Sequence, residues 1–193
     1  MHKVLEDLGL TAADILSLPT HEQEEILRLV DAYDHQKMIE ECRTSFSAFV
    51  HRMWPVVDGA AFVEGKHHKR LAEVLDQVAE GKIKRVAISL PPRHSKSMFV
   101  SKLFPAYFIG RNASKFIIQA CNIKGLADQF GASVRSILMS PEYQEIFPET
   151  KLDASSTAKG DWATTKFDGV IKFDAATTSV LPSTRGDAVI YCE

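Results

Sequence analysis

Apolar and polar residues alternate in blocks along this chain, and residues 1–60 have the spacing of helices. One stripe of apolar positions with helical spacing lies among acidic neighbours: Ile26, Leu29, Val30 and Tyr33. Residues 20–23 have the pattern of a capping box that would begin this helix. A further helix begins near Phe46 and should end at Trp54, because a proline at 55 disfavours helical dihedrals in the residue before it. We therefore expect an N-terminal helical region.

The next block predicts a helix over residues 67–79, followed by Gly81 in the left-handed conformation that often ends a helix. Its apolar face would consist of Leu71, Val74, Leu75 and Val78. The helix begins in a basic turn, residues 66–70, although a helix N-terminus disfavours cations. This turn is either solvated or part of it meets a nucleotide or a nucleic acid.

Two short, continuous apolar runs, residues 86–90 and 115–121, have the pattern of strands that are buried on both faces. A helix is expected after each run, from residue 98 with an end or kink at Pro105, and over 124–139. Alternating strands and helices predict an α/β fold with a parallel sheet. We accordingly divide the chain into a helical region, 1–60, and an α/β domain, 61–193.

From Ser140 the pattern changes. A short helical turn should begin at Pro141, and the pair Asp168-Gly169 between apolar runs predicts a β-hairpin. A strand is expected at 179–181, and a last apolar run at 188–191 ends in Cys192 and Glu193. An apolar strand that ends in acidic residues often supplies a metal ligand and a general base. Here Glu193 can be the base, but a neutral thiol at Cys192 cannot replace a carboxylate as a ligand for a hard cation.

Composition limits the class of protein. With 193 residues, 45% hydrophobic and 25% charged, the chain suits a soluble globular protein with a sizeable core. It has no run long enough to span a membrane and no signal peptide, which favours the cytosol. Its three isolated cysteines indicate neither a disulfide framework nor a zinc site. The net charge is −2, but basic residues outnumber acidic ones between residues 65 and 102, as an anionic ligand would require.

The segment Leu90-Pro91-Pro92-Arg93-His94-Ser95-Lys96-Ser97 carries the most specific chemistry. A polar turn between a strand and a helix, ending in Lys-Ser, is the arrangement of a phosphate-binding (Walker A) loop. Lys96 would reach the β and γ phosphates, and the Ser97 hydroxyl would bind Mg²⁺. Leu90 and Ser95 stand where the usual G-x-x-x-x-G-K-[ST] pattern has glycines. The alternative is a surface turn with a chance Lys-Ser pair.

Several stretches, in order, resemble the large terminase subunits of tailed phages or prophages. They are PPRHSKS at 91–97, the GKHH stretch at 65–68, FPAYFIGRN at 104–112, SPEY at 140–143 with FP at 147–148, and RGD at 185–187. The resemblance covers residues 46–193. It implies an ASCE-like P-loop NTPase fold, a mostly parallel sheet flanked by helices. This fold would be incomplete at the C-terminus, with no nuclease domain, and would carry an N-terminal helical appendage.

The same resemblance implies an ATPase motor that hydrolyses Mg·ATP to drive DNA translocation into the capsid. Its cofactors would be ATP and Mg²⁺. Its partners would be double-stranded viral DNA, the terminase small subunit and the portal protein, with a homo-oligomeric ring when full length and no membrane. The location would be the host cytoplasm. The alternatives are a degenerate nucleotide-binding or interaction module without turnover, and a helicase-like DNA-dependent ATPase.

Residue roles follow the resemblance only where residues match. Catalytic roles fall on Glu193, on Arg93 at the γ-phosphate, and on Lys96. Nucleotide-binding residues would be Pro92, Arg93, His94, Ser95, Lys96 and Ser97, together with His67 and His68 near the base. Ser97 would be the metal ligand. Cys192 departs from the family's aspartate and places hydrolysis in doubt.

Overall fold

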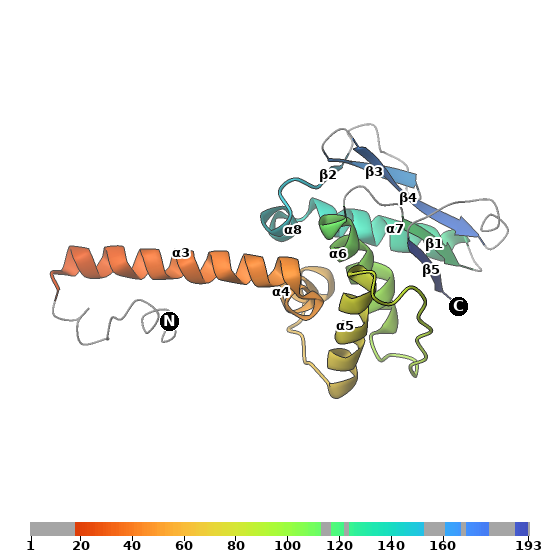
Figure 1. Cartoon of the computed structure of the whole chain (residues 1–193), viewed down its shortest axis with the longest axis horizontal. Helices are drawn as coiled ribbons and strands as arrows, with labels where there is room; N and C mark the ends of the chain where they lie inside the picture. Colours follow the sequence, from red (N-terminus) through yellow and green to blue (C-terminus); the bar gives the residue numbers. More distant parts are fainter. Residues whose placement is uncertain are drawn as a thin grey trace. The chain divides into compact units, whose positions relative to one another are not determined.

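The computed structural model describes residues 18–112, 117–121, 124–152, 161–166, 169–177 and 188–192 (Figure 1). The chain divides into two compact units, Met1–Glu41 and Cys42–Glu193. The boundary between the units, after Glu41, therefore falls inside the region predicted to be helical. Residues 46–58 belong to the same unit as the loop at 90–98. The functional division at residue 60 stays a prediction.

In the first unit, helix α3 (Thr20–Thr44) lies where the sequence predicted a helix and continues into the first residues of the second unit. The N–H groups of Glu22 and Gln23 donate to the Pro19 carbonyl, which begins the helix. The predicted apolar stripe is not a uniform packing face. Val30 is buried, but Leu29 and Tyr33 are 65% and 50% exposed.

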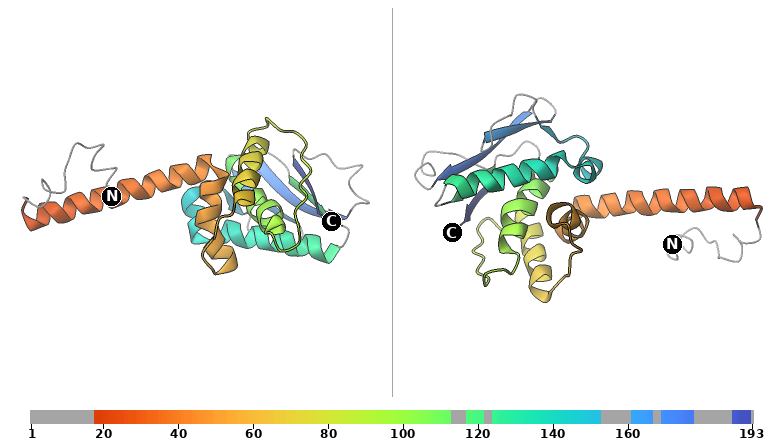
Figure 2. Two further views of the ribbon diagram at one scale, coloured as in Figure 1. Left: turned by 90° about the horizontal axis from the view of Figure 1, so that it is seen from below. Right: turned by 180° about the vertical axis from the view of Figure 1, so that it is seen from behind.

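Helices build the core of the second unit (Figures 1 and 2). They are α4 (Phe46–Asp58), α5 (Lys66–Ala79), the π-helical segment η1 (Met98–Leu103), α6 (Phe104–Arg111), α7 (Lys124–Met139) and α8 (Pro141–Ile146). Fully buried aromatic side chains join them. The Phe46 ring meets the Phe99 and Phe104 rings edge to face, at centroid distances of 5.9 and 5.7 Å. Such pairs add to the stabilisation that apolar burial provides.

Helix α4 does not end at Trp54, as predicted, but continues through Pro55 to Asp58. It closes at Gly59, whose φ of 76° allows its N–H to donate to the Pro55 carbonyl. The Trp54 ring packs 4.7 Å from the Phe62 ring and 6.1 Å from the Phe99 ring. Tertiary packing thus outweighs the local preference of the residue before a proline.

Helix α5 and the glycine after it confirm the prediction for this block. Leu71 and Leu75 are buried, and Gly81 has a φ of 75°. A partly buried carboxylate fixes α5 against its neighbours. The Asp76 Oδ1 accepts hydrogen bonds from the Phe46 N–H at 2.8 Å and the Tyr107 hydroxyl at 3.0 Å.

Among the residues that the structure describes, five strands form one mixed sheet in the order β2-β3-β4-β1-β5. They are β1 (Ile117–Cys121), β2 (Lys151–Leu152), β3 (Asp161–Lys166), β4 (Gly169–Thr177) and β5 (Ala188–Cys192). Strand β1 pairs in parallel with β4 and β5, whereas β2, β3 and β4 pair antiparallel. Helix α7 lies against β4 and β1 (Figure 2).

Strands β3 and β4 form the predicted hairpin, but Gly169, predicted to be a turn residue, is the first residue of β4 and pairs with Lys166, so the register differs by one residue from the prediction. The strands β1 and β5 lie within or over the apolar runs that predicted them. The strand predicted at 179–181 lies outside the described residues.

The predicted fold class, an ASCE-like P-loop NTPase with a mostly parallel sheet, is wrong for this structure. Of the residues whose side chains are described, 72% are helical, and the described strands form a mixed sheet rather than a mostly parallel one. Residues 86–90, predicted to be the central strand before the loop, form no strand, and Val86 is 44% exposed. Pro91 and Pro92 have no N–H to donate to a strand ladder, and charged residues 84–85 keep the segment's other end in solvent.

Among the described residues, no helix combines the length and apolar composition needed to cross a membrane.

Candidate phosphate-binding site

The loop at 90–98 has an unusual backbone. Arg93 and Ser95 each have a φ of 62°, and they are the two non-glycine residues with positive φ among the residues that the structure describes. The left-handed conformation costs an L-residue about 1–2 kcal/mol. Residues in left-handed and right-handed helical conformations that follow one another turn their N–H groups into one concavity, which binds anions. Positive φ at Arg93 and Ser95, on either side of His94, is the backbone feature that such a concavity requires.

A helix begins directly after this turn. The Phe99 N–H donates to the Ser95 carbonyl, four residues back, at 3.0 Å. The N–H groups of Lys96, Ser97 and Met98 come before that bond, in the first turn. The N–H groups of a first turn have no carbonyl acceptor within the helix. The helix dipole adds partial positive charge at the same place. Both features favour a phosphate group here.

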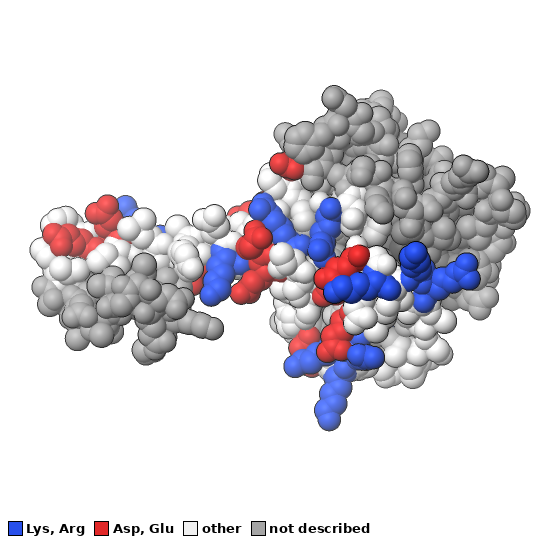
Figure 3. Space-filling model, viewed as in Figure 1, with Lys and Arg blue, Asp and Glu red and all other residues white. Residues whose placement is uncertain are grey.

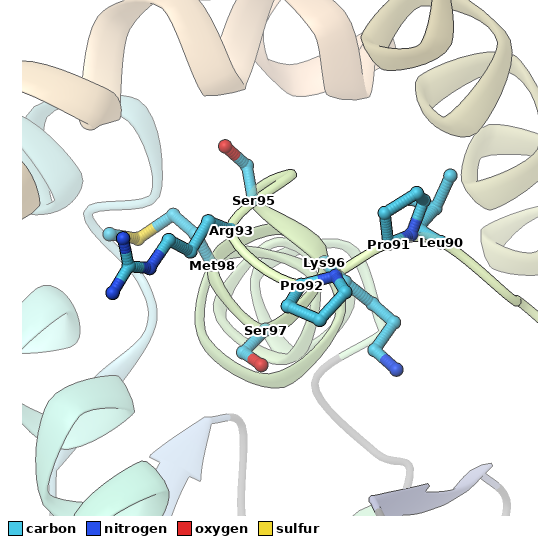
Figure 4. Close-up of a pocket in the computed structure, with 8 residues that line it drawn as sticks. All are labelled: Leu90, Pro91, Pro92, Arg93, Ser95, Lys96, Ser97 and Met98. Atoms are coloured by element: carbon cyan, nitrogen blue, oxygen red, sulfur yellow. The ribbon is translucent and has the colours of Figure 1, made fainter.

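The loop lines an open hollow of about 390 Å³. Its lining residues are Leu90, Pro91, Pro92, Arg93, Ser95, Lys96, Ser97 and Met98. Figure 4 shows the Lys96 and Ser97 side chains leaving the loop on one side, whereas Arg93 and Ser95 point in other directions. The structure thus brings together the two residues predicted for phosphate and Mg²⁺, and it places the Arg93 guanidinium apart from them.

A second predicted segment lies beside the loop. At the start of α5 the His67 and His68 rings are 3.8 Å apart, and the His67 ring meets the His94 ring edge to face at 5.6 Å. The His94 Nδ1 lies 2.9 Å from the Pro92 carbonyl oxygen, which holds that ring on the loop. The two segments predicted to bind a nucleotide, residues 67–68 and 92–97, are therefore in contact through His67 and His94.

The His68 side chain is buried and is held by a ring contact and a hydrogen bond. Its ring stacks on the Phe99 ring at 5.2 Å, and its Nδ1 accepts the Gly65 N–H at 3.0 Å. Burial lowers the pKa of His68, and repulsion from His67 lowers it further. The ring is therefore neutral near pH 7, with Nδ1 as acceptor and the proton on Nε2. Within the described part of the chain, the buried Nε2 atoms of His67 and His68 have no hydrogen-bond partner.

The basic block around the loop is partly neutralised. Carboxylates pair with three of its cations: Lys69 with Glu64 at 3.4 Å, Arg70 with Glu73 at 3.0 Å, and Lys82 with Glu80 at 2.7 Å. Figure 3 accordingly shows acidic side chains beside basic ones on the second unit. The attraction for a phosphate therefore depends on the loop itself more than on the sum of surface charges.

The chain end is described only in part. Strand β5 pairs with β1 and contacts η1, the helix that begins at the loop. Cys192 is the last residue of β5, while Glu193, the predicted base, lies outside the described residues. Among the residues described, no group of three or more His, Cys, Asp or Glu side chains could hold a metal ion. Mg²⁺ bound at the Ser97 hydroxyl would take its other ligands from phosphate oxygens and water.

Two features of this site have little signal in the sequence. The positive φ of Arg93 falls on a residue type that gives no hint of it, and the contact between His67 and His94 joins positions far apart in the chain. The strain at Ser95 does have a signal, because the phosphate-loop pattern has glycine at that position.

Comparison with known protein families, with curated proteins and with solved structures found none that matches this chain.

Proposed function

We propose that residues 90–98 bind the phosphates of Mg·ATP and that the chain acts as the ATPase module of a terminase-like DNA-packaging motor. The observation that carries the proposal is the backbone of the loop: left-handed residues at 93 and 95 lead directly into a helix N-terminus. This conformation supports phosphate binding without the preceding strand that the sequence predicted. The motor role is supported by the resemblance of residues 46–193 to large terminase subunits.

In this proposal main-chain amides of the loop hold the β and γ phosphates, and the Lys96 ammonium neutralises their charge. The Ser97 hydroxyl on the same side of the loop would contribute one ligand to Mg²⁺. The unpartnered Nε2 atoms of His67 and His68 are buried, so they would meet polar atoms of the nucleoside only after the rings reorient. Arg93 would reach the γ-phosphate only after its side chain reorients.

A second candidate function is nucleotide binding without turnover. Cys192 ends β5, the strand in contact with η1, and a thiol there offers no oxygen ligand for Mg²⁺. Such a module would bind ATP and act through its partners. Phosphate release in the presence and absence of double-stranded DNA separates the two functions: turnover that Glu193→Gln abolishes supports the motor, and binding with no turnover supports the module.

Titration calorimetry with Mg·ATP tests the binding site shared by both functions. Lys96→Ala should abolish measurable binding, because the loop loses the cation that neutralises the phosphates. Lys84→Ala is the matched control, since it removes the same charge from the exposed segment before the loop and should bind like the wild type. Equal affinity of Lys96→Ala and wild type, with both proteins folded by circular dichroism, would refute the proposal.

A further inference from the structure

The helix that begins at the phosphate loop starts with α-helical residues, Lys96 and Ser97, and then becomes π-helical. Segment η1 follows Ser97 directly, and the Phe104 N–H donates to the Phe99 carbonyl, five residues back. An α-helix would use the carbonyl four residues back. Short π-helical segments are uncommon and occur frequently at functional sites. The π-helical bonding of η1 therefore needs a physical explanation.

Pro105 supplies one part of the cause. An α-helix would pair the N–H of residue 105 with the Ser101 carbonyl, but proline has no N–H. The carboxamide of Gln119 donates to this carbonyl instead, with Nε2 3.3 Å from the oxygen. Ser101 is 2% exposed and Gln119 is fully buried, so water does not compete for the bond.

Gln119 lies on the strand that links the loop helix to the sheet. It is the middle residue of β1, and it is in register with Ala175 of β4 and Ile190 of β5. Both neighbouring strands run parallel to β1. One side chain therefore joins the backbone of η1 to the centre of the parallel part of the sheet.

We propose that Gln119 is a positioning residue for the phosphate loop. By holding the Ser101 carbonyl it keeps η1 in its π-helical form, and this sets the direction in which the Lys96 and Ser97 N–H groups leave the first turn. The inference rests on the proposed function, since it assigns Gln119 a role in Mg·ATP binding. A regular α-helix at 98–103 would rotate the first turn relative to β1 and misplace those donors.

Two substitutions separate positioning from stability. Gln119→Met keeps the length of the side chain and removes the donor to the Ser101 carbonyl. Pro105→Ala provides a backbone N–H that can donate to the same carbonyl in a regular α-helix. The double variant therefore restores a donor to the Ser101 carbonyl but not the π-helical geometry. Gln129→Met on the exposed face of α7 is the matched control.

The experiment measures Mg·ATP affinity by calorimetry and thermal unfolding by circular dichroism on the full chain. We expect Gln119→Met to lower the melting temperature and weaken binding about tenfold, as expected for the loss of one buried hydrogen bond that acts through the loop. The double variant should regain the melting temperature but not the affinity. Pro105→Ala alone should stay folded and bind more weakly than the wild type, and Gln129→Met should match the wild type.

Recovery of both stability and affinity in the double variant would overturn the inference, because Gln119 would then serve packing alone. Wild-type affinity in Gln119→Met or in Pro105→Ala would overturn it as well. If the wild type itself binds no Mg·ATP, the proposed function fails first. A wild type that binds alongside insensitive variants refutes the role of Gln119 and leaves the proposed function standing.

Discussion

The imidazole rings of His67 and His94 meet edge to face with their centroids 5.6 Å apart. His67 lies in the first turn of α5, and His94 lies within the loop at 90–98. This contact connects two segments whose chemistry the sequence indicates separately. The loop at 90–98 therefore has the His67 and His68 side chains beside it, and the Nε2 atoms of both are buried.

Ser95→Gly should stabilise the protein. Ser95 has a φ of 62°, which glycine adopts without the steric cost that a Cβ brings. We expect the free energy of unfolding to rise by about 1 kcal/mol, measured by urea denaturation. The glycine also restores the usual phosphate-loop pattern, so Mg·ATP affinity should not fall.

Ser95→Ala is the control for this substitution, since it removes the hydroxyl and keeps the Cβ. It should be no more stable than the wild type. A Ser95→Gly protein less stable than Ser95→Ala would show that the left-handed backbone at Ser95 is not strained.

The stability of the protein should depend on pH through His68. Burial lowers the pKa of His68 from its ordinary value of 6.5. As the pH falls below about 6.5, the unfolded chain therefore takes up a proton on this histidine before the folded protein does. The contribution of His68 to stability is complete above pH 6.5 and is lost as the pH falls toward the lowered value.

Urea denaturation at pH 7.5, 6.5 and 5.5 measures this dependence. His68→Phe keeps a ring on Phe99 and cannot titrate, so its stability should fall less steeply with acid than that of the wild type. His21→Phe replaces an exposed histidine and should follow the wild type. Identical pH profiles for wild type and His68→Phe would contradict the buried, neutral state of His68.

Asp76→Ala should destabilise the second unit strongly. It leaves the Phe46 N–H and the Tyr107 hydroxyl without the carboxylate that accepts both. Two buried donors that lose a charged acceptor cost about 2–4 kcal/mol.

Glu73→Ala, on the same helix, is the matched control. Its partner Arg70 is 75% exposed, and a surface ion pair contributes at most about 0.5 kcal/mol. Chemical denaturation compares the free energies of unfolding of the two variants, and equal losses would mean that Asp76 does not link α4, α5 and α6 through its hydrogen bonds.

The sequence is informative where one segment determines its own structure. The helix at 66–79, the left-handed Gly81 and the hairpin between β3 and β4 all follow from local patterns, and the structure confirms them. The conformation of Ser95 was predictable in the same sense, since the phosphate-loop pattern has a glycine there.

Predictions that depend on distant partners were less successful. The apolar run at 86–90 has the composition of a buried strand, but its pairing depends on the rest of the sheet and on the two prolines that follow. The end of α4 depends on how Trp54 packs against Phe62 and Phe99. Neither the contact of His67 with His94 nor that of Gln119 with Ser101 has a spacing rule from which it could be predicted.

The most direct test of the phosphate-binding loop is to follow its own amides. Amide chemical shifts of the full chain, recorded by NMR during titration with Mg·ATP and separately with inorganic triphosphate, report whether main-chain donors meet the ligand. We predict that the amide signals of Lys96, Ser97 and Met98 move together and saturate with both ligands. Saturating shifts elsewhere in the chain, with these three amides unmoved, would contradict it.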